Sequence, residues 1–349
     1  QLKNKDCFRS WIISIARNKC NDYFRKKAGV YEIPIDALTG RELSHGRFGV
    51  LEVTTVRETL NLLGDKDKQI LYLFFWKELP QAEIAKQLSI PLGTVKSRLY
   101  TAKQKFKNIY PYQVWLDGMY MAQPFYMKYE MKFNGMKGCM DSIHQFENVE
   151  RLMKDEKTGL YYHGYDESRQ MYWANPETGC SENFWLRALG WFSVSLVETA
   201  TAMTDVLYDE FRYLLRLLEN LVEALIPYQD ESGMFWQVVD HQGEEGNYLE
   251  TSGTALIAYA ILKAVRLGYL PDIYENIGVR ALEGIIDRYL SIDDEGNLEL
   301  GGICLVAGLG GKTRRDGSTE YYYSEPVVKN EAKGVAPLLL AYVELLRRG

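Results

Sequence analysis

The sequence predicts an all-α protein made of two parts, and three observations lead to this fold class. Apolar residues recur at helical spacing through most of the 349 residues, and the only convincing strand candidates are short, near residues 235–239 and 303–307. The segments between the predicted helices are rich in Gly, Asp and Tyr, which favours a helical bundle or toroid over a sheet protein. The charge balance reverses near residue 110, from +9 for residues 1–110 to −15 for residues 111–349.

The basic first part is expected to contain three segments. Residues 1–28 include an amphipathic helix with a basic end, and its apolar positions are Phe8, Trp11, Ile12, Ile15 and Ala16. Residues 29–56 lose this periodicity and mix glycine, proline and polar residues, as a linker does. Residues 57–110 return to helical spacing. The excess of Lys and Arg in one part of an acidic chain indicates a nucleic-acid partner for that part alone.

Within residues 79–106, two short helical patterns separated by a break at 89–91 predict a helix-turn-helix. The apolar stripes of the two helices are Ile84, Ala85 and Leu88, then Val95, Leu99, Ala102 and Phe106. The opposite face of the second helix carries Thr94, Lys96, Ser97, Arg98, Thr101, Lys103 and Lys105. Lys and Arg bond phosphates and guanine edges, and a single helix fits the major groove. The alternative is a helical pair with a solvated basic face.

Two blocks of this part resemble extracytoplasmic-function sigma factors. FRSWIISIARNKCNDYFRKK is similar to the end of their second conserved region. LGDKDKQILYLFFWKELPQAEIAKQLSIPLGTVKSRLYTAKQKF is similar to their fourth region, which reads the −35 promoter element. The resemblance implies promoter DNA as a partner, with RNA polymerase core as a further one. It places the DNA contacts on Thr94, Lys96, Ser97 and Arg98.

The acidic second part, residues 112–349, is expected to form seven long helices. Their predicted ranges are 115–131, 138–153, 183–203, 205–226, 250–267, 272–291 and 332–347. Between them lie loops, the longest at 155–182. Two glycine-containing stretches, GLGGKT at 308–313 and RRDG at 314–317, are interpreted as structural, because the first lacks the spacing of a phosphate-binding loop and the second reads as a solvated basic turn.

Asp117 is the first candidate catalytic residue, because it stands between Trp115 and Tyr120. Burial against aromatic rings disfavours the ionised carboxylate, raises its pKa and lets the acid hold a proton near neutral pH. The alternative is a carboxylate that stabilises the first turn of a helix through the helix dipole.

Three further residues are candidates for holding a sugar. Arg187 and Trp191 are four residues apart on one predicted helix, so that a guanidinium could meet a carboxylate and an indole could meet a sugar ring. His163 lies in a loop between tyrosines. The alternatives are a structural cation–π pair for Arg187 and Trp191, and a loop histidine bonded to a carbonyl group for His163.

Five blocks in one order resemble glycoside hydrolase family 105, the unsaturated rhamnogalacturonyl and related uronyl hydrolases. The blocks are WLDGMYMAQPF, DEKTGLYYHGYDES, WANPETGCSENFWLRALGW, ETSGTALIAYAILKAVRLGYL and RRDGSTEYYYSEPVVKNEAKGVAPLLLA. The resemblance implies an (α/α)6 toroid, which is incomplete here because it needs twelve helices and seven are predicted. It makes Asp117 the proton donor, with Trp115, His163, Arg187 and Trp191 as substrate-binding residues.

The implied reaction hydrates the C4=C5 double bond of an unsaturated uronic-acid oligosaccharide, as pectin lyases release it. The second hypothesis is a promoter-binding protein that carries an inactive helical passenger. We expect neither a metal nor another cofactor, and no membrane, because the chain contains no metal-ligand motif and no apolar run of transmembrane length. Five scattered cysteines without a CxxC pair favour the cytoplasm. The exposed faces of an incomplete toroid would fit a homodimer.

Overall fold

The computed structural model describes residues 63–77, 79–107, 112–203, 205–311 and 314–347. The predicted helix within 1–28 and the linker at 29–56 therefore lie outside the described residues. Contacts between residues divide the described part of the chain into two compact units, with the boundary between Gln113 and Val114.

The described residues of the first unit are mainly helical. This unit contains α4 (Asp65–Leu71), the π-helical turn η2 (Tyr72–Trp76), α5 (Gln81–Gln87) and α6 (Leu92–Lys107). Ser89 has a φ of +52° in the turn between α5 and α6. The core of this unit consists of Leu63, Ile70, Leu71, Leu73, Ile84, Val95, Leu99 and Ala102. Most of the predicted inner stripe of α6 is thus buried, while the side chain of Phe106 lies outside the described part.

In its described residues, the second unit contains seven long helices, as the sequence predicts, and one short helix. They are α7 (Gly118–Phe133), α8 (Cys139–Met153), α9 (Leu186–Ala202), α10 (Tyr208–Leu225), α11 (Thr251–Arg266), α12 (Glu275–Tyr289), α13 (Thr319–Ser324) and α14 (Ala332–Leu346). Single 3-10 turns lie at η3 (Asp205–Leu207), η4 (Ile226–Tyr228) and η5 (Asp272–Tyr274). The predicted ends of the long helices lie within three residues of the observed ends.

Short strands connect these helices. They are β1 (Gln113–Trp115), β2 (Gly164–Asp166), β3 (Leu290–Ile292), β4 (Leu298–Leu300), β5 (Ile303–Cys304) and β6 (Val327–Val328). β3 pairs antiparallel with β4, and β5 pairs antiparallel with β6. The predicted strand at 303–307 is confirmed in part as β5. The predicted strand at 235–239 is wrong, because this segment makes only isolated bridges, from Trp236 to Leu249 and from Val238 to Trp185.

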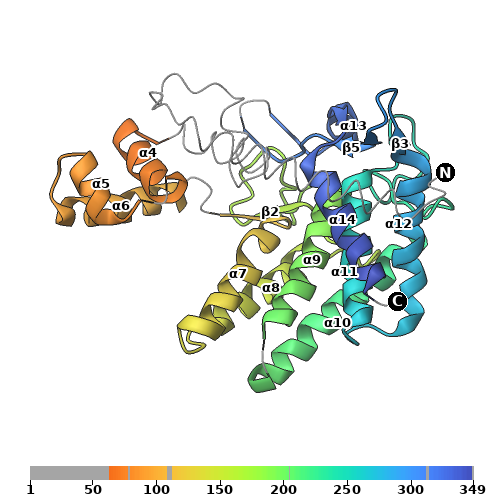
Figure 1. Cartoon of the computed structure of the whole chain (residues 1–349), viewed down its shortest axis with the longest axis horizontal. Helices are drawn as coiled ribbons and strands as arrows, with labels where there is room; N and C mark the ends of the chain where they lie inside the picture. Colours follow the sequence, from red (N-terminus) through yellow and green to blue (C-terminus); the bar gives the residue numbers. More distant parts are fainter. Residues whose placement is uncertain (1–62, 78, 108–111, 204, 312–313, 348–349) are drawn as a thin grey trace. The chain divides into compact units, whose positions relative to one another are not determined.

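The long helices form two layers (Figure 1). α7, α9, α11 and α14 pack side by side in that order, and α8, α10 and α12 pack against α7, α9 and α11. α9 and α11 are buried on nearly all sides, whereas α10 buries only its leucine-rich face. This alternation of paired helices is consistent with the predicted (α/α) toroid.

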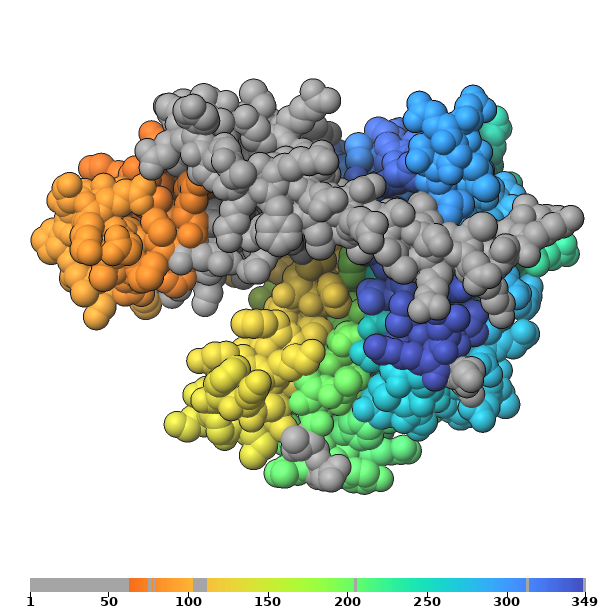
Figure 2. Space-filling model, viewed as in Figure 1, coloured from red at the N-terminus to blue at the C-terminus, as the bar shows by residue number. Residues whose placement is uncertain are grey.

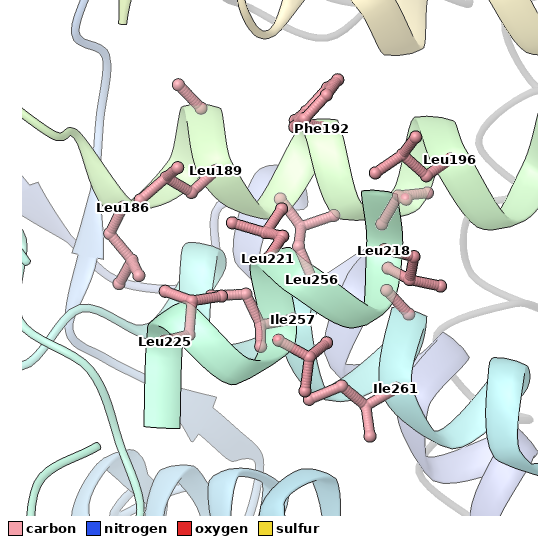
Figure 3. Close-up of a cluster of buried hydrophobic side chains, with 14 of the residues drawn as sticks. Leu186, Leu189, Phe192, Leu196, Leu218, Leu221, Leu225, Leu256, Ile257 and Ile261 are labelled. Atoms are coloured by element: carbon pink, nitrogen blue, oxygen red, sulfur yellow. The ribbon is translucent and has the colours of Figure 1, made fainter. Parts of the chain in front are cut away.

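The core between the layers is built from large apolar side chains, mostly leucine and isoleucine (Figure 3). Leu186, Leu189, Phe192 and Leu196 come from α9, Leu218, Leu221 and Leu225 from α10, and Leu256, Ile257 and Ile261 from α11. Each is almost completely removed from solvent. Burying one such side chain stabilises a fold by about 1.5–3 kcal/mol, so this cluster fixes α9 and α11 relative to each other.

Glycine allows α9 and α11 to approach closely where they cross. A Cβ atom on Gly190 would lie 2.8 Å from Cβ of Leu256 and 3.0 Å from the carbonyl oxygen of Gly253. Both neighbours belong to the rigid part of the packed helix, so they cannot move aside cheaply. The first turn of α9 is thereby held against the first turn of α11.

One face of α7 is apolar and exposed. Phe125 and Phe133 are 73% and 69% exposed, and both their rings lie against that of Tyr129. The surface of α7 and α8 is the yellow region in Figure 2. Exposed apolar rows of this kind mark surfaces that associate.

The crossing of α9 and α11 gives a stability prediction. Gly190→Ala should lower the free energy of unfolding by about 1–3 kcal/mol, because the added methyl group overpacks the crossing. Gly118→Ala is the matched control, since a Cβ there meets nothing within 4 Å. The measurement is chemical denaturation followed by tryptophan fluorescence. Equal stability of the two variants would contradict the close packing.

Candidate active site

Asp117 lies at the N-terminus of α7, where the chain turns from β1 into the helix. It occupies the N-cap position, but its side chain makes no capping hydrogen bond. A hydrogen bond of the preceding residue fixes this turn. The backbone N–H of Leu116 donates to the carbonyl oxygen of His163 over 2.9 Å. The loop that ends at β2 thus brings His163 beside Asp117.

The two side chains face each other without a hydrogen bond. Nε2 of His163 lies 3.9 Å from Oδ1 of Asp117, and neither atom has a hydrogen-bond partner among the residues that the structure describes. Burial raises the pKa of Asp117 to about 6, although its backbone hydrogen bonds and the charge of Arg187 act in the opposite direction. Asp117 can therefore exist as acid or as carboxylate near neutral pH, as a proton donor requires.

His163 is completely buried among aromatic rings. Its ring centroid lies 4.6 Å from that of Trp185 and 6.0 Å from that of Trp115, and its Nδ1 lies 2.7 Å from the hydroxyl of Tyr322. Burial, together with the positive charges of Arg315 and Arg187, lowers the pKa of His163 to about 3. The imidazole is therefore neutral. The alternative of a histidine bonded to a carbonyl group is wrong, since its partner is a tyrosine hydroxyl.

Arg187 projects from the first turn of α9 and is completely buried. Its Nη2 donates to the carbonyl oxygen of Cys304 over 2.5 Å, and its guanidinium lies 5.1 Å from the ring centroid of Trp185. Nε and Nη1 have no partner in the described part of the chain. A buried guanidinium with two unpaired nitrogens, Nε and Nη1, can bind an anion, and a carboxylate matches its geometry.

Trp191 lies one turn further along α9 and stacks on Tyr120. The ring centroids are 4.5 Å apart and the planes are inclined by 23°. The cation–π partner of Arg187 is Trp185 rather than Trp191, so the predicted structural pair of Arg187 with Trp191 is wrong. The geometry brings Asp117, His163 and Arg187 together, and it places Trp191 with α7.

The sequence prediction missed Arg315. The stretch RRDG at 314–317 was expected to be a solvated turn, but Arg315 is only 8% exposed and its Nε donates to the carbonyl oxygen of Gly310 over 3.2 Å. The signal that could have revealed it is the pair of glycines, Gly310 and Gly317, whose positive φ angles let the loop fold back. Among the described residues, no group of His, Cys, Asp and Glu has the arrangement of a metal site.

The predicted DNA-binding residues lie on the first turns of α6. Lys96 and Ser97 are exposed, and Thr94 and Arg98 are partly exposed. Ser97 and Arg98 also line a surface groove together with Gly64–Asp67, at the start of α4. These side chains are thus placed on a surface, as a DNA contact requires.

The comparison with sequence profiles decides the family. The profile of Glycosyl Hydrolase Family 88 matches residues 65–349.

The chain belongs to glycosyl hydrolase family 88. Its fold is also that of a solved family 105 glycoside hydrolase from C. acetobutylicum, with a TM-score of 0.67 and 40% identity over 76% of this chain and 77% of that one. The predicted resemblance to family 105 is thus confirmed. Protein Atu3128 of Agrobacterium fabrum is 41% identical over 233 residues, which cover 65% of this chain and 98% of the relative.

Two further relatives of this family 88 chain bear functional names. The unsaturated rhamnogalacturonyl hydrolase YesR of Bacillus subtilis is 27% identical over 54% of this chain, which spans about half (49%) of that relative. The sigma factor SigW of Bacillus subtilis is 27% identical over 29% of this chain and 61% of the relative. The second resemblance predicted from the sequence is therefore also confirmed.

No helix in the described residues of this family 88 chain is long and apolar enough to cross a membrane.

The raised pKa of Asp117 gives a prediction about stability. The carboxyl titrates at 3.8 in a model compound and at about 6 in the fold, so the folded state keeps a proton that the unfolded state has released. Stability therefore falls as the pH rises from 4 to 6. At pH 8, the free energy of unfolding of Asp117→Asn should be about 2–3 kcal/mol higher than that of the unaltered chain.

The same variant at pH 3 is the internal control. Both proteins are uncharged at position 117 below the two pKa values, so the difference should disappear there. Urea denaturation at both pH values measures it. A difference in stability that is the same at pH 3 and pH 8 would show that the fold does not raise the pKa of Asp117.

Proposed function

We propose that residues 112–349 are a hydrolase of unsaturated uronides, of the rhamnogalacturonyl type. The observation that carries the proposal is a largely buried acid, Asp117, whose side chain is 18% exposed and whose pKa is raised to about 6 beside the unpaired donors of Arg187. A proton donor and an anion-binding guanidinium in one buried cluster suit a substrate with both a reactive double bond and a carboxylate. The name of YesR supports this substrate class.

In the proposed reaction, Asp117 transfers its proton to C4 of the C4=C5 double bond, and water adds at C5. The ring oxygen stabilises the positive charge that develops at C5. The resulting hemiketal opens and releases the neighbouring sugar, and the proton that leaves the water restores Asp117. Arg187 binds the uronate carboxylate, and Trp115 and Trp191 form walls of the sugar site. Asp117 and Arg187 both act through charge, and electrostatic interactions are stronger in a site that excludes water.

The test of this proposal is turnover by the full chain. Incubation with an unsaturated rhamnogalacturonan disaccharide should abolish the ultraviolet absorbance of the conjugated double bond. Asp117→Asn should lower kcat by a factor of about 10²–10⁴, as expected for the loss of a general acid. Asp209→Asn, an exposed carboxylate on α10, is the matched control and should keep full activity. Unchanged absorbance with the unaltered chain would refute the activity.

We infer a second function, DNA binding, for the first part of the chain, within the proposed boundaries 57–110. The exposed Lys96 and Ser97 on α6 and the match to SigW support it. Promoter DNA and RNA polymerase core are the proposed partners. The proposed helix at 1–28 and linker at 29–56 complete this part, and a homodimer and a cytoplasmic location remain further proposals for the whole chain.

DNA binding predicts a strong dependence on salt. The affinity of the full chain for duplex DNA should fall steeply between 50 and 200 mM salt, by about one power of the salt concentration for each phosphate contact. Lys96→Ala should lower that exponent by about one. Lys86→Ala on α5, whose amino group pairs with Glu83, is the control. Binding that is undetectable or insensitive to salt would exclude this function.

A further inference from the structure

We propose that Tyr322 is a positioning residue that fixes the tautomer of His163, so that the Nε2–H of His163 points toward Asp117. The hydroxyl of Tyr322 makes its hydrogen bond to His163 and not to Asp117. The kinetic part of this inference rests on the proposed function, whereas the tautomer does not.

The hydrogen bond between the two residues sets the tautomer. The hydroxyl of Tyr322 is completely buried and lies 2.7 Å from Nδ1 of His163, its only hydrogen-bond partner among the described residues. A buried O–H group needs an acceptor, and the lone pair of Nδ1 is the one within reach. Tyr322 therefore donates and Nδ1 accepts. A neutral imidazole then carries its proton on Nε2.

The surroundings keep both groups in this state. Burial raises the pKa of Tyr322 well above its ordinary value, so the phenol keeps its proton. The charged groups that face His163 are Asp117 at the start of α7, Arg187 on α9 and Arg315 in the loop before α13. The two arginines disfavour a second proton on the imidazole. The neutral ring thus persists across the pH range in which Asp117 titrates.

Aromatic packing holds the orientation of the imidazole ring. The ring of Trp185 lies 4.6 Å from that of His163 and 6.2 Å from that of Tyr322, almost parallel to the latter. Gln237 accepts a hydrogen bond from the indole N–H of Trp185 over 3.2 Å. A ring flip that exchanged Nδ1 and Nε2 would break the bond to Tyr322 inside this packing.

The orientation matters when Asp117 has given up its proton. At 3.9 Å, Nε2 and Oδ1 are too far apart for a hydrogen bond, and a movement of about 1 Å would form one. The new carboxylate then meets an N–H donor, which stabilises it. The other tautomer would present a lone pair to the carboxylate and repel it. By holding His163 in the Nε2–H tautomer, Tyr322 favours the loss of the proton from Asp117.

The tautomer can be measured without substrate. In a long-range ¹⁵N–¹H NMR spectrum of the unaltered full chain at pH 7, His163 should show a protonated Nε2 and an unprotonated Nδ1. The chain has four histidines, and the spectrum of His163→Gln assigns the signals. A protonated Nδ1, or an imidazolium, would overturn the proposal whether or not the chain has activity.

The kinetic test uses Tyr322→Phe, which removes only the hydroxyl. We expect kcat to fall about tenfold, the value of one such hydrogen bond, with KM within twofold. The imidazole signals of His163 should change to a mixture of tautomers. Tyr323→Phe is the matched control, because its hydroxyl donates to Glu244 and its activity and tautomer should not change.

Two results of this experiment would overturn a positioning role. One is an Nε2–H tautomer that Tyr322→Phe leaves intact. The other is a rise in KM with unchanged kcat, which would place Tyr322 in substrate binding. If the unaltered chain does not turn over the disaccharide, the proposed function fails, and the tautomer alone decides the role of Tyr322.

Discussion

The close crossing of α9 and α11 is the constraint on which the candidate site depends. A Cβ on Gly253 would lie 2.9 Å from the backbone nitrogen of Arg187, so the first turns of the two helices nearly touch. The N-cap of α11, Glu250, accepts hydrogen bonds from the backbone of Gly253 and of Cys304. The carbonyl oxygen of Cys304 in turn accepts from Arg187. One helix crossing thereby fixes a strand, a carboxylate and the buried guanidinium.

Burial of charge gives the site its chemistry. Desolvation raises the pKa of Asp117 and lowers that of His163, and the positive charge of Arg187 acts on both. Arg187 opposes the shift at the acid and reinforces the shift at the imidazole. The result is an acid that can change its protonation state near neutral pH beside a base that stays neutral. Such a divergence of neighbouring titratable groups is typical of functional sites.

The two units differ in the sign of their charge and in whether their charged groups are exposed. The first unit presents basic side chains on α6, and the second is acidic and encloses its charged site. These properties suit different partners, since a polyanion is drawn to an exposed basic face and a small uronide to a buried guanidinium. The two units therefore need not share a ligand.

The sequence by itself determined where the long helices lie and which carboxyl has a raised pKa. Helical periodicity located the seven long helices among the described residues of the second unit, because apolar residues recur at helical spacing over 15 to 18 residues in each. The aromatic neighbours of Asp117 correctly indicated a carboxyl whose pKa is raised. Both indications depend on residues close together in the chain.

Only the tertiary structure decided which distant residues meet. Tyr322 stands 159 positions from His163, and no spacing rule connects them. Arg315 was predicted to be solvated because its own segment is polar, yet the loop folds inward through turns at Gly310 and Gly317. The cation–π partner of Arg187 also proved to be Trp185, two residues away, since the backbone at the helix start departs from helical spacing. Contacts across the fold depend on helix crossings and loop turns, which local periodicity does not encode.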